Sequence, residues 1–286
     1  MDPDILIVHG SRSPMTPMVL DSPHSGHLFP ADFGAIADID ALRDGEDCFI
    51  DTLYMPATER GVPLLAAQFP RTYLDPNRHA ADIDLDLLPD GAWPHEYVPS
   101  GKARIGKSLI WRLVGEGEPI YDRQLSVDEV RARVRRYHEP YHQALRELIA
   151  AAHAAFGVSV HLNCHSMPAV SGAIGVAGPG VTHADIVLGD RDGTTCEPAL
   201  TEFVREHLSA RGYEVKINDP YKGVELVRAY SSPAQGRHSL QIEVNKRLYM
   251  DEATRQPHAG FDRLQADLMH LVDALCQRYM SGARHA

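Results

Sequence analysis

Two histidines and a carboxylate are the residues of this chain whose types best suit metal chemistry. His24 stands in "SPHSG", Asp47 in "GEDCFIDTLY", and His165 at the end of "VSVHLNCH". Two imidazoles, one carboxylate and an open fourth position form the ligand set of a catalytic zinc, which binds water and lowers its pKa to about 7. The spacing alone does not force the three together, so the set is a hypothesis.

Each of these residues also has a structural interpretation. Taken alone, His24 is better explained as a structural or surface histidine, although Pro23 before it and the Ser-Gly turn after it could aim the ring into a cleft. Glu46 and Asp47 precede a predicted helix, where carboxylates cap free backbone N–H groups and are favoured by the helix dipole. Capping is the simpler reading from position alone.

Strand alternation separates the two histidines of "HLNCHSMP" from its cysteine. His161 and His165 fall on one face of the predicted strand, and Cys164 falls on the apolar face. His165, at the strand end, is therefore the better ligand candidate. His161 is better explained as a supporting or core residue.

Further polar residues could supply catalysis and anion binding. Glu243 lies in the otherwise apolar "LQIEVN". If this segment is a central strand, the buried carboxylate needs a cation, a hydrogen-bond donor or a water-filled cleft beside it. If it is an exposed edge strand, the carboxylate needs no such partner. "PRTYLDPNR" combines Arg71, Asn77 and Arg78 with Asp75, which could orient them. These arginines could bind a carboxylate, because a guanidinium matches a carboxylate through two parallel hydrogen bonds. The alternative interpretation of the segment is a surface turn built on Asp-Pro-Asn.

Composition and motifs exclude several classes of protein. The 286 residues carry 39 acidic and 28 basic side chains, a formal charge of -11 without a dense Lys/Arg run, which argues against a nucleic-acid partner. No apolar stretch is long enough to span a bilayer and the start does not resemble a signal peptide, so we expect a cytoplasmic protein without a membrane partner. The four cysteines form no C-x-x-C pair and are interpreted as reduced thiols.

The elements that must position these residues alternate along the chain, which favours an α/β fold. Strands are predicted in "DILIVHG", "PMVLDSPHSG", "VPLLAAQF", "VSVHLNCH", "ADIVLGD", "YEVKIND" and "HSLQIEVNKRLY". Helices are predicted in "EDCFIDTLYMPATERG", from Ser126 through Leu148 to an end at Gly157, in "EPALTEFVREHLSARG" and from about Phe261 to Tyr279. No repeat or linker marks a boundary, so residues 1–286 are expected to form one domain.

Local signals define the longest of these helices. Ser126 and Glu129 form a capping box, Pro140 should kink the helix or begin a second one, and Gly157 should end it. The glycine run at 172–180 does not join a strand to a helix, as a dinucleotide-binding site requires. The sequence also lacks a P-loop and the G-x-S-x-G motif, which argues against a P-loop nucleotide-binding protein and a serine hydrolase. Since ligands of open α/β sheets bind at the carboxyl ends of strands, the polar residues at those ends are the first candidates.

Five motifs in order, "LDSPHSG", "EDCFIDTLY", "RTYLDPNR", "NCHSMP" and "LQIEVNKRLYMDE", resemble the N-formylglutamate amidohydrolase (deformylase) family from about residue 18 to the C-terminal helix. The resemblance implies a relative of zinc carboxypeptidases and aspartoacylase, with a mixed central β-sheet flanked by helices on both faces. It also implies hydrolysis of N-formyl-L-glutamate to formate and L-glutamate, a late step of histidine breakdown.

The resemblance implies a Zn2+ site with His24 and His165 as ligands. In the aspartoacylase and carboxypeptidase branch the acidic ligand is a glutamate three residues after the first histidine, where this chain has His27. We therefore assign the acidic ligand to Asp47, with Glu46 as the reserve.

The remaining roles also follow from the resemblance. Glu243 resembles the catalytic carboxylate, Arg71 the arginine that polarises the scissile carbonyl, and Asn77 with Arg78 the pair that grips the substrate's carboxylate. The substrate has a second carboxylate, for which the candidates are Lys222, Arg228, Arg237 and His238.

The expected partner is a small N-acyl amino acid. Two alternatives stay open: a zinc amidohydrolase for another N-acyl amino acid or small peptide, and a binding protein without catalysis. The retained histidines, glutamate and arginines argue against the second, because anion binding needs no general base. Asn163 stands where relatives often have aspartate; it could orient a neighbour, yet it removes a charge.

Overall fold

The computed structural model describes residues 2–172 and 177–283. The predicted glycine-rich loop includes residues 173–176, which lie outside this range. The described chain divides into two compact units. Unit 1 comprises residues 2–7, 23–46 and 66–144, and unit 2 comprises residues 8–22, 47–65 and the described part of 145–286. In the described chain no helix combines the length and the apolar character that crossing a membrane requires.

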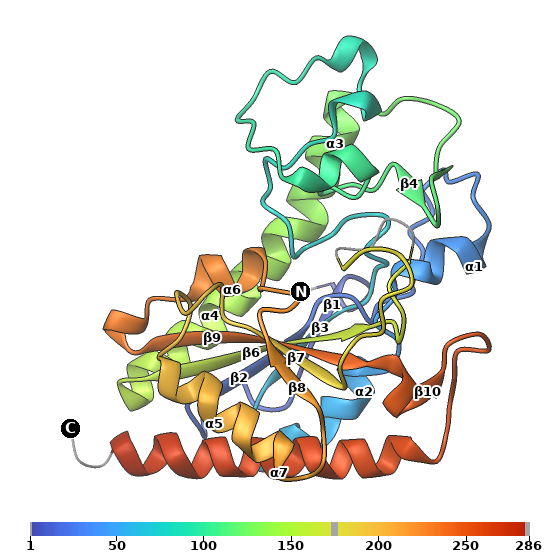
Figure 1. Cartoon of the computed structure of the whole chain (residues 1–286). Helices are drawn as coiled ribbons and strands as arrows, with labels where there is room; N and C mark the ends of the chain where they lie inside the picture. The colour runs from blue at the N-terminus through green and yellow to red at the C-terminus, as the bar shows by residue number, and fades with distance from the viewer. Residues whose placement is uncertain (1, 173–176, 284–286) are drawn as a thin grey trace. The chain divides into compact units, whose positions relative to one another are not determined.

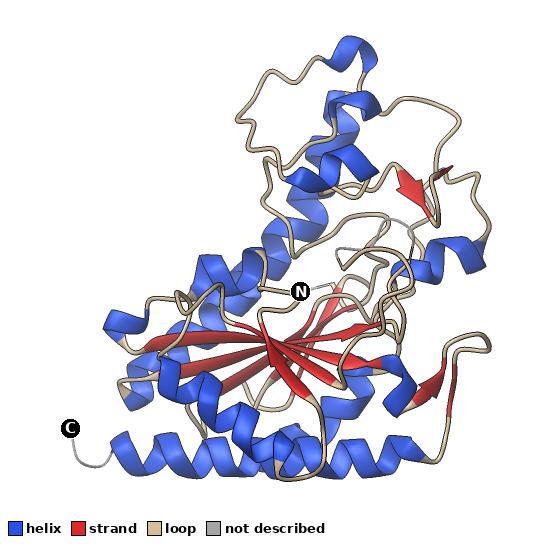
Figure 2. Ribbon diagram, in the orientation of Figure 1, coloured by secondary structure: helices blue, strands red, loops and turns tan. Residues whose placement is uncertain are grey.

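A seven-stranded sheet (Figure 2) carries His161, His165 and Glu243 on its strands β6 and β9. Strands β2, β6 and β9 run parallel, β7 is antiparallel to β9, and β8 is parallel to β7, so the sheet is mixed, as predicted. The strands in spatial order are β1 (Leu6–His9), β3 (Leu64–Ala67), β2 (Met18–Ser22), β6 (Ser159–Met167), β9 (Arg237–Asn245), β7 (Ile186–Gly189) and β8 (Val215–Ile217).

The two faces of the central strands differ sharply in character. One face packs its apolar residues against helices α2 (Ile50–Tyr54), α5 (Pro198–Ser209) and α7 (Gly260–Ala283). Cys164 belongs to this apolar core, as the alternation predicts. Helix α6 (Glu225–Tyr230) lies against β6 and β9 on the other side of the sheet (Figure 1). On that side the strands present buried polar groups: Asp21, His161, Asn163, His165, Gln241 and Glu243.

The long predicted helix is interrupted. Helix α3 (Val127–Arg133) begins with the predicted capping box, a π-helix follows at Val134–His138, and α4 runs over Glu139–Phe156. The π-helix ends just before Pro140, whose missing N–H and bulky ring prevent a regular α-helical turn there. Gly157 follows α4 with φ +73°, a conformation that glycine adopts without steric cost.

The helix predicted over residues 46–61 is shorter than expected. Only Ile50–Tyr54 is α-helical, and a 3-10 helix continues over Met55–Arg60 with Pro56 in its first turn. Since proline cannot donate the next helical hydrogen bond, the α-helix stops there. The N-cap of this helix is Phe49, which makes no side-chain cap.

Unit 1 consists largely of loops around buried aromatic rings. Arg133 lies 4.0 Å from the ring centre of Tyr73 and donates to the hydroxyl of Tyr121 at 2.7 Å. Its guanidinium also donates to the backbone carbonyl of Tyr73, which fixes the segment that leads to Asp75.

The two units together contain these further short elements: α1 (Ile39–Leu42), the pair β4 (Leu113–Val114) and β5 (Glu118–Pro119), the pair β10 (Met250–Asp251) and β11 (Gln256–Pro257), and 3-10 helices at Arg43–Gly45, Leu85–Leu87, Pro89–Gly91, Gly101–Ile105, Pro233–Gln235 and Lys246–Leu248.

Candidate active site

His24 is held by a carboxylate fifty-one residues away. Its Nε2 lies 2.7 Å from Oδ1 of Asp75, and both side chains are buried. Gly26, just after it, passes so close to the backbone of Gln68 that a Cβ would lie 2.3 Å from the carbonyl carbon, so only glycine fits this turn. Since the carboxylate accepts from Nε2, the ring offers Nδ1 to a ligand.

Asp75 also organises the neighbouring basic residues. Its Oδ2 accepts from Nη2 of Arg71 at 2.7 Å, and Nε of Arg78 lies 3.8 Å from the same oxygen. Burial by itself would raise the pKa of Asp75, but the charges of Arg71, His24 and Arg78 hold it well below its usual value. Asp75 is therefore ionised and can hold the imidazole of His24 and the guanidinium of Arg71 together.

A pair of stacked histidines fixes the turn that carries Asn77 and Arg78. His138 ends the π-helix, His142 lies one turn on, and their ring centres are 3.9 Å apart. His138 donates to the carbonyl of Arg78 at 2.9 Å, and His142 donates to that of Pro76 at 2.8 Å. Asn77 and Arg78 are buried, so the alternative of an exposed Asp-Pro-Asn turn is wrong.

His165 is oriented from its own strand. Nε2 of His165 lies 2.8 Å from Oδ1 of Asn163, while Nδ2 of Asn163 donates to Oδ1 of Asp21 at 2.8 Å. Because the carboxylate of Asp21 accepts, the amide oxygen of Asn163 must face His165 and accept from its Nε2. The same Asp21 oxygen lies 2.8 Å from Nε2 of His161, which is thus a buried supporting residue, as predicted.

Asp47 faces the other nitrogen of His165. Its Oδ2 lies 2.9 Å from Nδ1 of His165, and its Oδ1 accepts from the hydroxyl of Ser166 at 3.2 Å. Because Nε2 of His165 is the donor to Asn163, Nδ1 of the neutral ring carries a lone pair, and this lone pair faces the carboxylate oxygen of Asp47. Such a pair suits a shared cation, because two ligands about 2.1 Å from one ion lie about 3.4 Å apart at the tetrahedral angle, close to the spacing of these two atoms.

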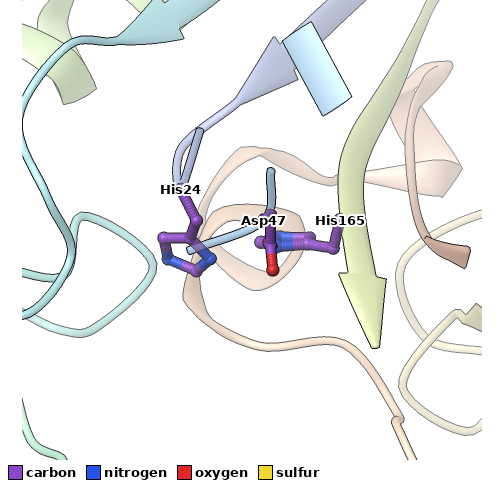
Figure 3. Close-up of side chains that lie close together, drawn as sticks. All are labelled: His24, Asp47 and His165. Atoms are coloured by element: carbon purple, nitrogen blue, oxygen red, sulfur yellow. The ribbon is translucent and has the colours of Figure 1, made fainter. Parts of the chain in front are cut away.

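The three predicted metal ligands come together. One ligand atom from each of His24, Asp47 and His165 lies within 4.8 Å of the others, and all three residues are buried (Figure 3). The reserve candidate Glu46 instead pairs with Arg43, whose Nε lies 2.6 Å from Oε2. Two imidazoles whose Nε2 atoms are each held by an oxygen acceptor, together with one carboxylate, fit a divalent metal such as zinc.

Glu243 lies in a central strand, so the edge-strand alternative is wrong. Strand β9 runs between β6 and β7, and Glu243 is in register with His165 of β6. Its Oε1 accepts from Nε2 of Gln241 at 2.8 Å, and its side chain is buried. The pleat places Glu243 on the same face as His165, which puts a carboxylate beside the candidate metal ligand.

The residues suggested for the second carboxylate are not gathered in one place. Arg228 is half-exposed and binds both oxygens of Glu225, and Arg237, at the opposite end of β9 from Glu243, contacts Gln235. Lys222 pairs with Asp192, and Nδ1 of His238 accepts from the backbone of Glu197. Their role stays a prediction.

Other residues of interest were missed by the sequence reasoning. Lys102 and Lys107 lie near Arg71 and Arg78, and Trp111 packs between basic groups. Asp21 connects two residues of β6. The sequence feature that could have pointed to Lys102, Lys107 and Trp111 is the segment "SGKARIGKSLIW", which brings two lysines and a tryptophan into one glycine-containing loop.

Comparisons with known sequences support one family. The sequence profile described as N-formylglutamate amidohydrolase matches residues 16–250. A protein of Pseudomonas aeruginosa named N-formylglutamate deformylase is 30% identical over 249 residues, covering 82% of this chain and 83% of that protein. One of the same name from Pseudomonas putida is 27% identical over 267 residues, covering 87% and 86%.

Solved structures agree with these sequence matches. The crystal structure of N-formylglutamate amidohydrolase from Ralstonia eutropha JMP134 is 45% identical and superposes with a TM-score of 0.92, over 98% of this chain and 99% of that one. A gene product of Agrobacterium tumefaciens, 19% identical with a TM-score of 0.64 over 98% and 96% of the two chains, shares the fold. This chain belongs to the N-formylglutamate amidohydrolase family.

Proposed function

We propose that this chain is a metal-dependent hydrolase that splits N-formyl-L-glutamate into formate and L-glutamate. The observation that carries the proposal is the buried group of His24, Asp47 and His165, whose ligand atoms lie within 4.8 Å of one another. Family membership supports the substrate. A divalent cation bound there, with Zn2+ as the first candidate, would polarise the formyl carbonyl and lower the pKa of water.

Glu243 is the proposed general base. Its carboxylate is held by Gln241 and lies on the face of the sheet that carries His165. It takes the proton of the attacking water and passes it to the leaving nitrogen of glutamate, so the C–N bond breaks with a neutral amine as the leaving group. The proton that Glu243 gains in the first step is the one it gives up in the second.

Arg71 is proposed to stabilise the negative charge that develops on the formyl oxygen. Asp75 holds its guanidinium at 2.7 Å, and the ring centre of Trp111 lies 5.1 Å from Cζ, so little reorganisation is needed when the charge forms. Asn77 and Arg78 are assigned to the α-carboxylate because they resemble the family's Asn-Arg pair, and His138 and His142 fix the turn that carries them. Arg228 and Arg237 remain candidates for the second carboxylate.

The test is formate release by the protein after zinc loading. N-formyl-L-glutamate should be hydrolysed faster than N-formyl-L-glutamine, since a site built around cations rejects an analogue that lacks the matching charge. Release of L-glutamate, which hydrolysis of either acyl group gives, compares N-formyl-L-glutamate with N-acetyl-L-glutamate. A protein that prefers another N-acyl amino acid would replace the substrate part of the proposal, and one that binds zinc and hydrolyses none of them would refute it. A cytoplasmic role in histidine breakdown is part of the same proposal and rests on the family resemblance.

A further inference from the structure

The proposed function leaves the side-chain carboxylate of the substrate without a convincing partner. We propose that Lys102 and Lys107 bind this carboxylate and thereby give the site its preference for acidic N-formyl amino acids. The inference rests on the proposed function and deepens it, because it names the residues that distinguish glutamate from its neutral analogues.

The backbone joins the two lysines to the assigned substrate-binding residue. Lys102 lies in the 3-10 helix Gly101–Ile105, and the N–H of Lys107 donates to the carbonyl of Lys102 at 3.0 Å. Nε of Arg78 then donates to the carbonyl of Lys107 at 3.3 Å. Gly106 turns the chain with φ +64°, and a Cβ there would lie 2.6 Å from Cγ of Leu113. This tight turn therefore holds both lysines beside Arg78.

Trp111 aligns one of these lysines with Arg71. Nζ of Lys107 lies 4.7 Å from the ring centre of Trp111, and Cζ of Arg71 lies 5.1 Å from it. Gly45 permits this packing, because a Cβ would lie 2.9 Å from the indole and 3.2 Å from Cδ of Arg71. Cation–π contacts hold both positive groups near one ring without neutralising either charge.

The charges of this cluster do not balance. Arg71, Arg78, Lys102 and Lys107 contribute four positive charges against three carboxylates: Asp75, which Arg71 and Arg78 share, Asp82, whose charge acts on Arg78, and Asp44, whose charge acts on Lys107. Neither lysine ammonium forms an ion pair or a hydrogen bond with any residue of the described chain. Burial, together with the charges of Arg78, Arg71 and Lys107, lowers the pKa of Lys102 to about 8. A substrate with two carboxylates would relieve this repulsion better than a monoanion.

The alternative candidates lack these properties. Arg228 already has both oxygens of Glu225 as acceptors, and the contacts of Lys222 with Asp192 are at the exposed surface. Exposed pairs of this kind hold an anion weakly, because water screens their charges. The lysines of the Arg78 turn are thus the better match to a bound carboxylate.

The test compares Lys102→Met and Lys107→Met with the parent enzyme on N-formyl-L-glutamate and N-formyl-L-glutamine. Each change should raise KM for the acidic substrate by about tenfold or more and leave kcat within about threefold, because uniform binding of a remote carboxylate is lost. The constants for N-formyl-L-glutamine should stay unchanged. Lys216→Met is the matched control, since Lys216 is an exposed lysine of β8 paired with Asp219.

Three further variants make the result decisive. Lys107→Arg keeps the charge and should retain most of the preference, whereas Lys107→Met keeps an aliphatic chain without the charge and should lose it, so the contrast assigns the effect to the charge. If both methionine variants kept the parent's preference for glutamate while Arg228→Gln or Arg237→Gln lost it, the inference would be wrong. If the zinc-loaded parent released no formate from either substrate, the proposed function itself would fail, which is a separate outcome.

Discussion

Asp75 and His24 are joined by a 2.7 Å contact between Oδ1 and Nε2, and the same carboxylate holds Arg71 through Oδ2 at 2.7 Å. One buried side chain thus orients a candidate metal ligand and a candidate oxyanion partner. Neither can be moved without disturbing the other, so Asp75 is a positioning residue for both.

Asp75→Asn should weaken zinc binding by about 10–100-fold, because an amide supports the imidazole of His24 less well than a carboxylate does. Competition with a chromogenic chelator measures this affinity. Asp84→Asn is the matched control, since Asp84 is also buried and pairs with an arginine, Arg112, at 2.8 Å. Parental zinc affinity in Asp75→Asn would contradict the assigned role.

Glu243→Gln should keep zinc and lower kcat by about 10²–10⁴-fold, because the amide cannot take a proton from water. Metal analysis and formate release on the same preparation separate the two properties. Glu202→Gln, at an exposed glutamate of α5 paired with Arg205, should leave both unchanged. Turnover at the parent rate in Glu243→Gln would remove it from the mechanism.

Asn163→Ala should lower zinc affinity about tenfold or more, since His165 loses the acceptor that fixes its Nε2. It should also reduce the free energy of unfolding by about 1–3 kcal/mol, because Asp21 loses a buried donor. Asn218→Ala tests whether the two effects are separable: Asn218 donates to Asp190 at 2.7 Å, so that variant should lose stability and retain zinc affinity. Equal zinc affinity in both variants would show that Asn163 does not orient the ligand.

The pH dependence of substrate capture follows from Lys102, whose pKa is lowered to about 8 by burial and by the charges of Arg78, Arg71 and Lys107, against the opposing effect of Asp75. Below that pH the ammonium is charged and attracts the side-chain carboxylate; above it the neutral amine does not. The value of kcat/KM for N-formyl-L-glutamate should therefore fall as pH rises through about 8. Lys102→Met should lose this step, and an identical profile in the variant would contradict the assignment.

Local pattern was sufficient to predict much of the fold. The two-residue alternation of β6 separated His165 from Cys164, and the capping box located the start of α3 to the residue. Propensity failed where a proline altered the helical hydrogen bonds, as in the shortened α2 and in the π-helix before Pro140. Those irregular turns depend on which backbone groups find partners elsewhere, and the sequence does not display this.

The site was predictable where residues stand at the ends of strands or, for Asp47, just before a helix. His24, Asp47 and His165 were found by type and position, with the resemblance to a family supplying the set. We did not predict the contact of Asp75 with His24 or the turn that joins Lys107 to Arg78, because each links segments that no sequence periodicity relates. Long-range packing alone decides such contacts.

We propose that His24, Asp47 and His165 hold a cation that hydrolysis of the formyl amide requires. The most direct measurement is a zinc titration of metal-stripped protein in which formate release from N-formyl-L-glutamate is followed. We expect almost no release without metal, a linear rise that ends at about one equivalent of zinc per chain, and no rise for His165→Ala. Full activity of the stripped protein, or the same titration curve for His165→Ala, would contradict it.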